Sequence, residues 1–313
     1  MCRTESLMSK PLAIAVFGTG PLAQPYLAAL HARSDVMVIA IGDVDSQAAR
    51  QVAAPWSARV WTDPVALLRE EAPEAFFALA PAAQLGDALE QAVALHIPCF
   101  VEPPGVTDWP AALRLQAGLQ AQPLVTAMSF PYRSTDIVRE AKEYLGPQPL
   151  HLARGTWFVP TTQPLTDLLW NDACHLLDLI RFFLGDIAKV QAVASGSTTL
   201  LLTLLARQGP VASVAVCSQL LPEPRRELEL PGEKWALHFT ENMSRLYFTE
   251  PSKTTLLRRM NEPWAEQVAA FLDAVRRQEP TRVISSLDDG LKTLAMCEWV
   301  RQALAGTQDA QAK

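Results

Sequence analysis

The stretch AVFGTGPLA, Ala15–Ala23, decides the fold predicted for this chain. It reads as the end of a buried strand over residues 12–17, then a G-x-G-x-x-A turn, then an apolar helix. Gly18 permits the tight turn, Gly20 lets the backbone approach a pyrophosphate, and Ala23 allows close packing of the helix on the strand. The helix N-terminus attracts phosphate. We therefore predict a dinucleotide site that includes Gly18, Thr19, Gly20, Pro21 and Leu22.

A second apolar run, residues 36–42, ends at Asp43. This acid follows Gly20 by 23 residues, close to the roughly 20 expected for the acid that binds the adenosine ribose. An acid there repels a 2′-phosphate, so the pattern favours NAD over NADP. The alternative role, capping the next helix, suits Asp45 better. Pro25 lies early in the first helix and is expected to bend it.

The rest of the chain predicts an α/β fold with two domains. Apolar strands alternate with helices as far as residue 130, which is typical of a doubly wound parallel Rossmann sheet. Strand-like runs between about residues 188 and 250 lack intervening helices and predict an open, largely antiparallel or mixed sheet. We expect a Rossmann domain over residues 1–130 and a substrate and oligomerisation domain over 131–313, with the last helices free to pack back on the first domain.

Composition excludes several classes of protein. With 49% apolar residues, 19% charged residues and a net charge of −6, the chain is globular and has no basic stripe for nucleic acid. Prolines and glycines interrupt the uncharged residues 11–30, which argues against a membrane span. Five cysteines without a C-x-x-C pair argue against disulfides and against a metal site. The leader lacks an apolar core, so a cytoplasmic protein is expected.

The stretch NDACHLLDLIRFFLG, Asn171–Gly185, places polar residues on an otherwise apolar helix. Asn171, His175 and Asp178 would share one face, and Asp172 lies within side-chain reach of His175. Because the helix is apolar nearly all round, this stripe must face partners or a cleft. The pattern favours His175 as a general acid/base assisted by Asp172 and Asn171, over a helix cap beside a satisfied core histidine.

In order and spacing, several segments resemble the Gfo/Idh/MocA family of oxidoreductases, over about residues 12–305. They include GTGPLAQPYLAAL, IGDVDSQAARQVA, LAPAAQLGDALEQAVALHIPCFVEPP, YRSTDIVREAKEYLG, HLLDLIRFFLG and WAEQVAAFLDAVRRQEP. The resemblance implies a Rossmann domain followed by an α/β domain whose sheet often pairs subunits. It thus implies a homodimer or homotetramer.

The resemblance also implies site residues. The family's Glu-Lys-Pro motif, whose glutamate lies near the nicotinamide ribose and whose lysine binds the substrate hydroxyl, becomes Glu102-Pro103-Pro104. The usual Thr-Pro-Asn becomes Ala80-Pro81-Ala82, and the histidine that exchanges the proton corresponds to His175. Losing one preorganised donor typically costs roughly 3 kcal/mol of transition-state stabilisation. The missing lysine is therefore the main departure from the family.

Three functions remain open on the sequence. The first is an NAD(P)-dependent oxidoreductase acting on a sugar-like or other small polar substrate, with His175 as acid/base and no catalytic lysine. The second is a non-catalytic nucleotide-binding sensor or scaffold. The third is a reductase of C=N or conjugated C=C bonds, as in the biliverdin-reductase-like branch. Arg133 and Trp157 are candidates for substrate contact, although a surface arginine and a core tryptophan are equally consistent with the sequence.

Overall fold

The computed structural model describes residues 10–146, 148–161, 163–218 and 222–311. The chain forms two compact units. The first comprises the chain to Ser129 together with Trp264–Leu287, and the second comprises Phe130–Pro263 with the chain from Asp288. In the described residues, no helix has the length and apolar character needed to span a membrane.

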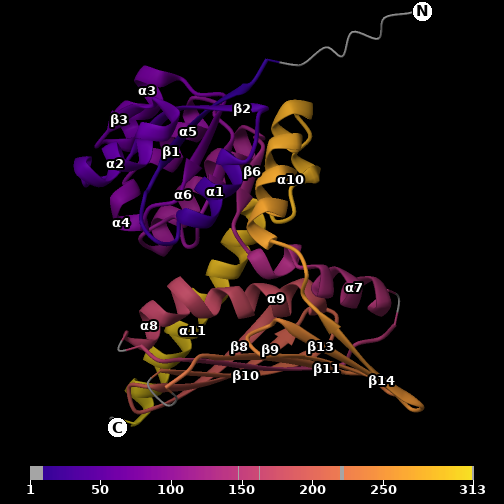
Figure 1. Ribbon diagram of the computed structural model, residues 1–313. Coiled ribbons are helices and arrows are strands. Elements are labelled where there is room, and N and C mark those ends of the chain that lie inside the picture. Colours follow the sequence, from indigo (N-terminus) through magenta and orange to yellow (C-terminus); the bar gives the residue numbers. More distant parts are fainter. Residues whose placement is uncertain (1–9, 147, 162, 219–221, 312–313) are drawn as a thin grey trace, which may run out of the picture. The chain divides into compact units, whose positions relative to one another are not determined.

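The first unit is built on a six-stranded parallel sheet (Figure 1). Its strands are β1 (Leu12–Phe17), β2 (Val36–Gly42), β3 (Arg59–Trp61), β4 (Ala75–Ala78), β5 (Cys99–Val101) and β6 (Thr126–Met128). They lie in the order β3-β2-β1-β4-β5-β6, which is the doubly wound Rossmann order. The predicted fold of this part is confirmed, and β4 is buried on both faces as its apolar sequence requires.

Helices connect the strands of this sheet and pack against it. They are α1 (Gln24–His31), α2 (Ser46–Ala53), α3 (Pro64–Glu71), α4 (Ala82–Leu85), α5 (Ala88–Ala94), α6 (Trp109–Ala121) and α10 (Pro263–Arg277), with short 3₁₀ turns η1 (Ala54–Trp56) and η4 (Pro280–Arg282). Asp45, Asp63 and Asp108 accept hydrogen bonds from backbone N–H groups of the helices they precede, which satisfies donors that have no intrahelical partner.

The segment between β4 and β5 forms two helices, α4 and α5, because Gly86 adopts a φ of 51° that ends the first of them. Pro25, expected to bend α1, lies in the first turn of that helix. Its missing N–H would have had no intrahelical partner there.

Helix α10 belongs to the core of the first unit although it comes late in the chain. Its residues Val268, Phe271 and Leu272 are fully buried and join the hydrophobic cluster formed by β1, β4, β5 and α1. The ring of Phe271 lies 5.4 Å from that of Phe77 and 5.6 Å from that of Phe100, both edge-on. Aromatic burial of this kind fixes α10 against the strands whose carboxyl ends form the candidate nucleotide site.

The second unit contains an eight-stranded sheet in the order β14-β13-β12-β11-β7-β10-β9-β8 (Figure 1). Its strands are β7 (Leu152–Val159), β8 (Ile187–Ser195), β9 (Thr199–Ala206), β10 (Val211–Ser218), β11 (Arg225–Pro231), β12 (Ala236–Thr240), β13 (Arg245–Glu250) and β14 (Lys253–Arg258). The β7–β10 pair is parallel and the other six are antiparallel. The largely antiparallel sheet predicted from the helix-free runs is thus confirmed.

Helices α7 (Asp136–Leu145), α8 (Leu165–Leu168) and α9 (Cys174–Leu184) lie along one face of this sheet (Figure 1). The unit also holds a 3₁₀ turn, η2 (Pro131–Ser134), a π-helical turn, η3 (Leu169–Ala173), and most of α11 (Leu287–Gln311). Gly155 of β7 lets α9 approach closely, because a Cβ there would lie 3.0 Å from the side chain of Leu176. This contact sets the depth of the helix that carries His175.

Candidate nucleotide and acid–base sites

The predicted nucleotide residues gather at the carboxyl edge of the six-stranded sheet. Phe17 pairs with Gly42 on one side and with Ala78 on the other, and Ala78 pairs with Val101. The segments that follow these strands, which contain Gly18, Asp43, Ala80 and Glu102, therefore lie along one edge. In open α/β sheets, ligands bind at that edge, beside the point where the strand order reverses.

Gly18 is required by the close approach of the segment that follows β4. Its φ is 112°, and a Cβ at this position would lie 2.3 Å from the backbone nitrogen of Ala80. Gly20 differs, because a Cβ added there meets nothing within 4 Å. The first glycine thus serves the fold, whereas the second leaves open space beside the start of α1, as a pyrophosphate requires. Pro21 and Leu22 are exposed in the same loop, and Pro81 is exposed beside buried Ala80.

Asp43 ties the glycine loop to the end of β2. Its Oδ2 accepts hydrogen bonds from the backbone N–H of Thr19 at 2.8 Å and from its hydroxyl at 2.7 Å, and its Oδ1 accepts from the N–H of Asp45 at 3.1 Å. Burial opposes ionisation, but the bonds from Thr19 and Asp45 together hold the pKa of Asp43 below its usual value. The acid is therefore ionised at neutral pH, beside the predicted nucleotide site.

Glu102 follows β5 and forms a hydrogen-bonded group with Tyr26 of α1 and Ser129, which follows β6. The Tyr26 hydroxyl donates to Oε2 of Glu102 at 2.8 Å and also contacts the Ser129 hydroxyl. Burial raises the pKa of Glu102 to about 7, although the bonds from Tyr26 and Ser129 act in the opposite direction. Pro103, the residue in place of the family lysine, is buried beside it. Glu102 thus changes charge near neutral pH.

We expect Glu102→Gln to change how the stability of the protein depends on pH. The folded-state pKa of about 7 lies above the usual 4.5, so ionisation of Glu102 disfavours the folded state as pH rises from 4.5 to 7, by at most about 3 kcal/mol. Glutamine retains an oxygen for the Tyr26 hydroxyl without the charge. Denaturant unfolding should therefore show the variant gaining stability over the native protein between pH 5 and pH 8. A gain that is equal at both pH values, or shared by the control Glu70→Gln at an exposed position of α3, would contradict the assignment.

In the second unit, His175 opens α9 among aromatic side chains. Its ring centroid lies 5.6 Å from that of Phe130 and 6.4 Å from that of Tyr132, both close to edge-on. Burial lowers the pKa of His175 to about 4; Asp172 opposes this shift and Arg226 adds to it. The imidazole is consequently neutral at neutral pH and can accept a proton. Its buried Nδ1 has no hydrogen-bond partner among the described residues.

Asp172 and Arg226 form the charged part of the surroundings of His175. The indole N–H of Trp157 donates to Oδ1 of Asp172 at 2.5 Å, and Nη2 of Arg226 lies 3.4 Å from the same oxygen. The guanidinium carbon of Arg226 lies 4.8 Å from the centre of the Trp157 ring. Sequence reasoning missed Arg226. The only local signal was an arginine at an inward-facing position of the strand RRELELP, Arg225–Pro231.

The other predicted residues of this unit do not gather at His175. Asn171 is exposed in the π-helical turn η3, and Asp178 is buried on α9. Arg133 is buried as well and binds Asp178 through two hydrogen bonds of 2.7 and 2.6 Å. In this bidentate pair each residue compensates the buried charge of the other, so Arg133 is already paired with a carboxylate in this arrangement.

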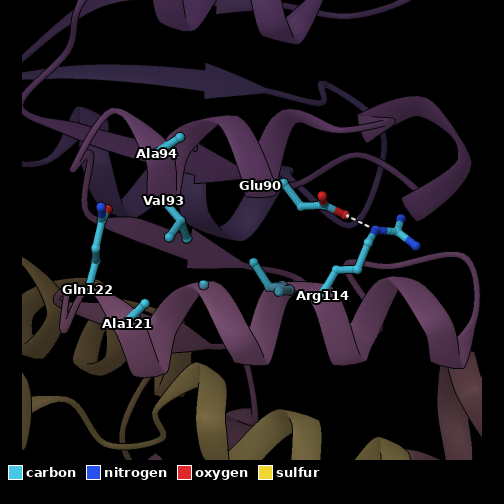
Figure 2. Close-up of a pocket in the computed structure, with 8 residues that line it drawn as sticks. Glu90, Val93, Ala94, Arg114, Ala121 and Gln122 are labelled. Atoms are coloured by element: carbon cyan, nitrogen blue, oxygen red, sulfur yellow. Dashed lines mark hydrogen bonds and ion pairs between the residues drawn. The ribbon is translucent and has the colours of Figure 1, made fainter.

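A pocket of about 270 Å³ lies between α5 and α6 of the first unit (Figure 2). Glu90 and Arg114 form an ion pair of 3.0 Å at one end, and Gln122 lies at the other. None of the predicted nucleotide residues lines it, which separates it from the candidate nucleotide site. Among the described residues, no three potential metal ligands come together.

Residues 12–130 match the model of the Gfo/Idh/MocA family, an oxidoreductase family with an NAD-binding Rossmann fold. No curated protein matches the chain by sequence. Many solved structures resemble the chain, and three of them match along almost their whole length. The first is a UDP-N-acetylglucosamine 3-dehydrogenase from Acidithiobacillus ferrooxidans, 21% identical with a TM-score of 0.82, for which the match covers 94% of this chain and 98% of that one.

The second is an oxidoreductase from Agrobacterium radiobacter in complex with NAD⁺, L-tartaric acid and magnesium, 18% identical with a TM-score of 0.79 and coverage of 95% and 97%. The third is a 3-ketoreductase from Actinomadura kijaniata in complex with NADP, 18% identical with a TM-score of 0.78 and coverage of 94% and 98%. At such identities these structures establish the fold of the chain.

Proposed function

We propose that this chain, whose residues 12–130 match the model of the Gfo/Idh/MocA oxidoreductase family with its NAD-binding Rossmann fold, is a nicotinamide-dependent oxidoreductase of a small polar substrate. His175 is the proton-exchanging group. The observation that carries the proposal is a neutral, partly buried imidazole whose Nδ1 has no hydrogen-bond partner in the described part of the chain. A buried polar atom of this kind is expected to meet a ligand.

The first unit has the features that a dinucleotide needs. Open space beside Gly20 and the start of α1 suits a pyrophosphate, and the carboxylate of Asp43 suits a ribose hydroxyl. Glu102 and Pro103, at the end of β5, are proposed to border the nicotinamide ribose, with Ala80 and Pro81 beside them. When bound, the nicotinamide accepts or donates a hydride, which is the redox chemistry that protein side chains lack.

The proposed part of His175 follows from its charge state. A neutral imidazole takes the proton of a substrate hydroxyl as the carbinol is oxidised, and returns a proton to the oxygen in the reverse direction. Asp172, held by the indole of Trp157, favours the imidazolium that forms. No role in substrate binding is proposed for Arg133, which is paired with Asp178.

The proposed preference for NAD depends on Asp43. We expect NADH to bind at least about tenfold more tightly than NADPH, because an ionised carboxylate repels the 2′-phosphate. Asp43→Asn should narrow this ratio, whereas Asp45→Asn, which alters only the cap of α2, should preserve it. Fluorescence titration of both nucleotides against the three proteins measures the ratios. Equal affinities in the native protein would remove Asp43 from cofactor selection.

A second candidate, a nucleotide-binding protein without turnover, is favoured by Pro103, which stands where the family lysine would bind a substrate hydroxyl. A histidine with a pKa of about 4 is also a weak base until a ligand changes its surroundings. Screening polyols and hydroxy acids for NADH formation separates the two candidates. Tight binding of NADH, without oxidation of any polyol or hydroxy acid, would favour the nucleotide-binding protein without turnover. The alternative of a C=N or C=C reductase is tested by measuring whether imines or enones oxidise NADH in the presence of the protein.

We further propose a homodimer or homotetramer that pairs through the open face of the eight-stranded sheet. Val193 of β8 and Leu201 of β9 are cross-strand neighbours that are 63% and 54% exposed, and Leu205 is 39% exposed on the same face of β9. An apolar patch of this kind is typical of an interface. None of the described cysteines forms a disulfide, which supports a reducing compartment such as the cytoplasm.

A further inference from the structure

Arg226 occupies an unusual position for a charged side chain. In the antiparallel pair of β11 and β7 it stands directly opposite Trp157, so the two side chains share one face of the sheet. That face is the covered one, because Leu228 and Leu230, two and four residues farther along β11, are fully buried on it. The neighbouring Arg225 points to the other face and pairs with Glu227 at 2.8 Å.

The charge of Arg226 is only partly matched by its surroundings. Its contact with Asp172 is 3.4 Å long, and the same carboxylate oxygen accepts the much shorter bond from the Trp157 indole. Tyr132, which also lies beside Arg226, remains protonated, because burial raises the pKa of its hydroxyl. The guanidinium therefore retains positive charge that could bind an anion.

Two buried polar atoms in this cluster have no hydrogen-bond partner within the described residues: Nε of Arg226 and Nδ1 of His175. An unpaired buried donor costs free energy, and such atoms are rare in folded proteins. Their occurrence together, around one carboxylate, indicates a ligand that offers an acceptor to Arg226 and a hydroxyl or carbonyl to His175.

We propose that Arg226 determines specificity by binding a carboxylate of the substrate, so that the substrate is a small hydroxy acid, such as a sugar acid, or the corresponding keto acid. The guanidinium presents a planar fork that matches a carboxylate in a bidentate fashion, which an ammonium group cannot do. This inference rests on the proposed function for the reaction itself, but the binding of the acid does not depend on turnover.

The reaction balances with these groups. The carbinol C–H bond breaks and its electron pair passes as hydride to oxidised nicotinamide, the hydroxyl proton passes to His175, and a C=O bond forms; the carboxylate is unchanged. The positive charge of Arg226 also favours the negative charge that develops on the reacting oxygen.

Paired ligands that differ only in charge test this assignment. Calorimetric titration of the full chain, with and without NADH, would compare L-threonate with L-threitol and D-gluconate with D-sorbitol. We expect at least one acid to bind about tenfold or more tightly than its neutral partner, as a charged hydrogen-bonded contact typically provides. Arg226→Gln should abolish the difference, Arg226→Lys should retain part of it, and Arg225→Gln should leave it unchanged.

A second readout follows His175 directly. A bound carboxylate offsets the charge of Arg226, so the pKa of the His175 imidazole, followed by NMR, should rise on addition of the preferred acid in the native protein and not in Arg226→Gln. Equal binding of acid and polyol, or a preference that survives Arg226→Gln in a folded variant, would overturn the assignment. If the acid binds but no NADH forms, the proposed oxidoreductase function is contradicted, whereas the assignment of Arg226 as the anion site stands.

Discussion

Gly18→Ala is expected to destabilise the first unit by about 3–5 kcal/mol, through two separate effects. The φ of 112° at this position is rarely adopted by residues with a side chain, and the new Cβ would lie 2.3 Å from the nitrogen of Ala80. That contact is with backbone, so no side chain can turn aside to relieve it. Urea denaturation followed by circular dichroism measures the loss.

Gly20→Ala is the matched control, because it adds the same methyl group two residues away. Nothing lies within 4 Å of that Cβ, so the free energy of unfolding should change by less than about 1 kcal/mol. If a pyrophosphate occupies the open space, however, NADH affinity should fall by about tenfold or more, equivalent to about 1.4 kcal/mol. If Gly20→Ala lost stability but kept its affinity for NADH, the roles assigned to Gly18 and Gly20 would be contradicted.

His175→Ala is expected to lower turnover by about a hundredfold or more, the range typical of general acid/base groups. Burial keeps the imidazole neutral at neutral pH, so its removal leaves the hydroxyl proton without an acceptor. The measurement is the rate of NADH formation, with whichever hydroxy acid or polyol the native protein oxidises. NADH affinity should be unchanged, since the predicted nucleotide residues belong to the first unit.

His151→Ala provides the control for a histidine in the same unit, since His151 is exposed just before β7. Its activity should equal that of the native protein. Full activity in folded His175→Ala would exclude His175 from proton exchange. Equal losses in both variants would point instead to a general disturbance of the second unit.

The nucleotide half of the molecule could be predicted in detail because its signals are local. The glycine loop follows its strand immediately, Asp43 ends the next strand, and Asp45 caps the helix after it. Such turns and caps depend on residues only a few positions apart. The doubly wound parallel sheet could likewise be predicted, since apolar strands alternate with helices throughout this part of the chain.

Apart from Asp172, which the sequence placed within reach, the surroundings of His175 were decided by tertiary structure. Asp172 accepts a hydrogen bond from the indole N–H of Trp157, 15 residues earlier in the chain. Arg226 lies opposite Trp157 because of the register in which β11 pairs with β7. Arg133, a candidate for substrate contact, is buried against Asp178, 45 residues later. The sequence by itself determined the order of the elements, the Rossmann loop and the helix that bears His175. It could not determine which charges meet, because the alternation within a strand indicates which face each side chain takes but not which distant strand lies beside it.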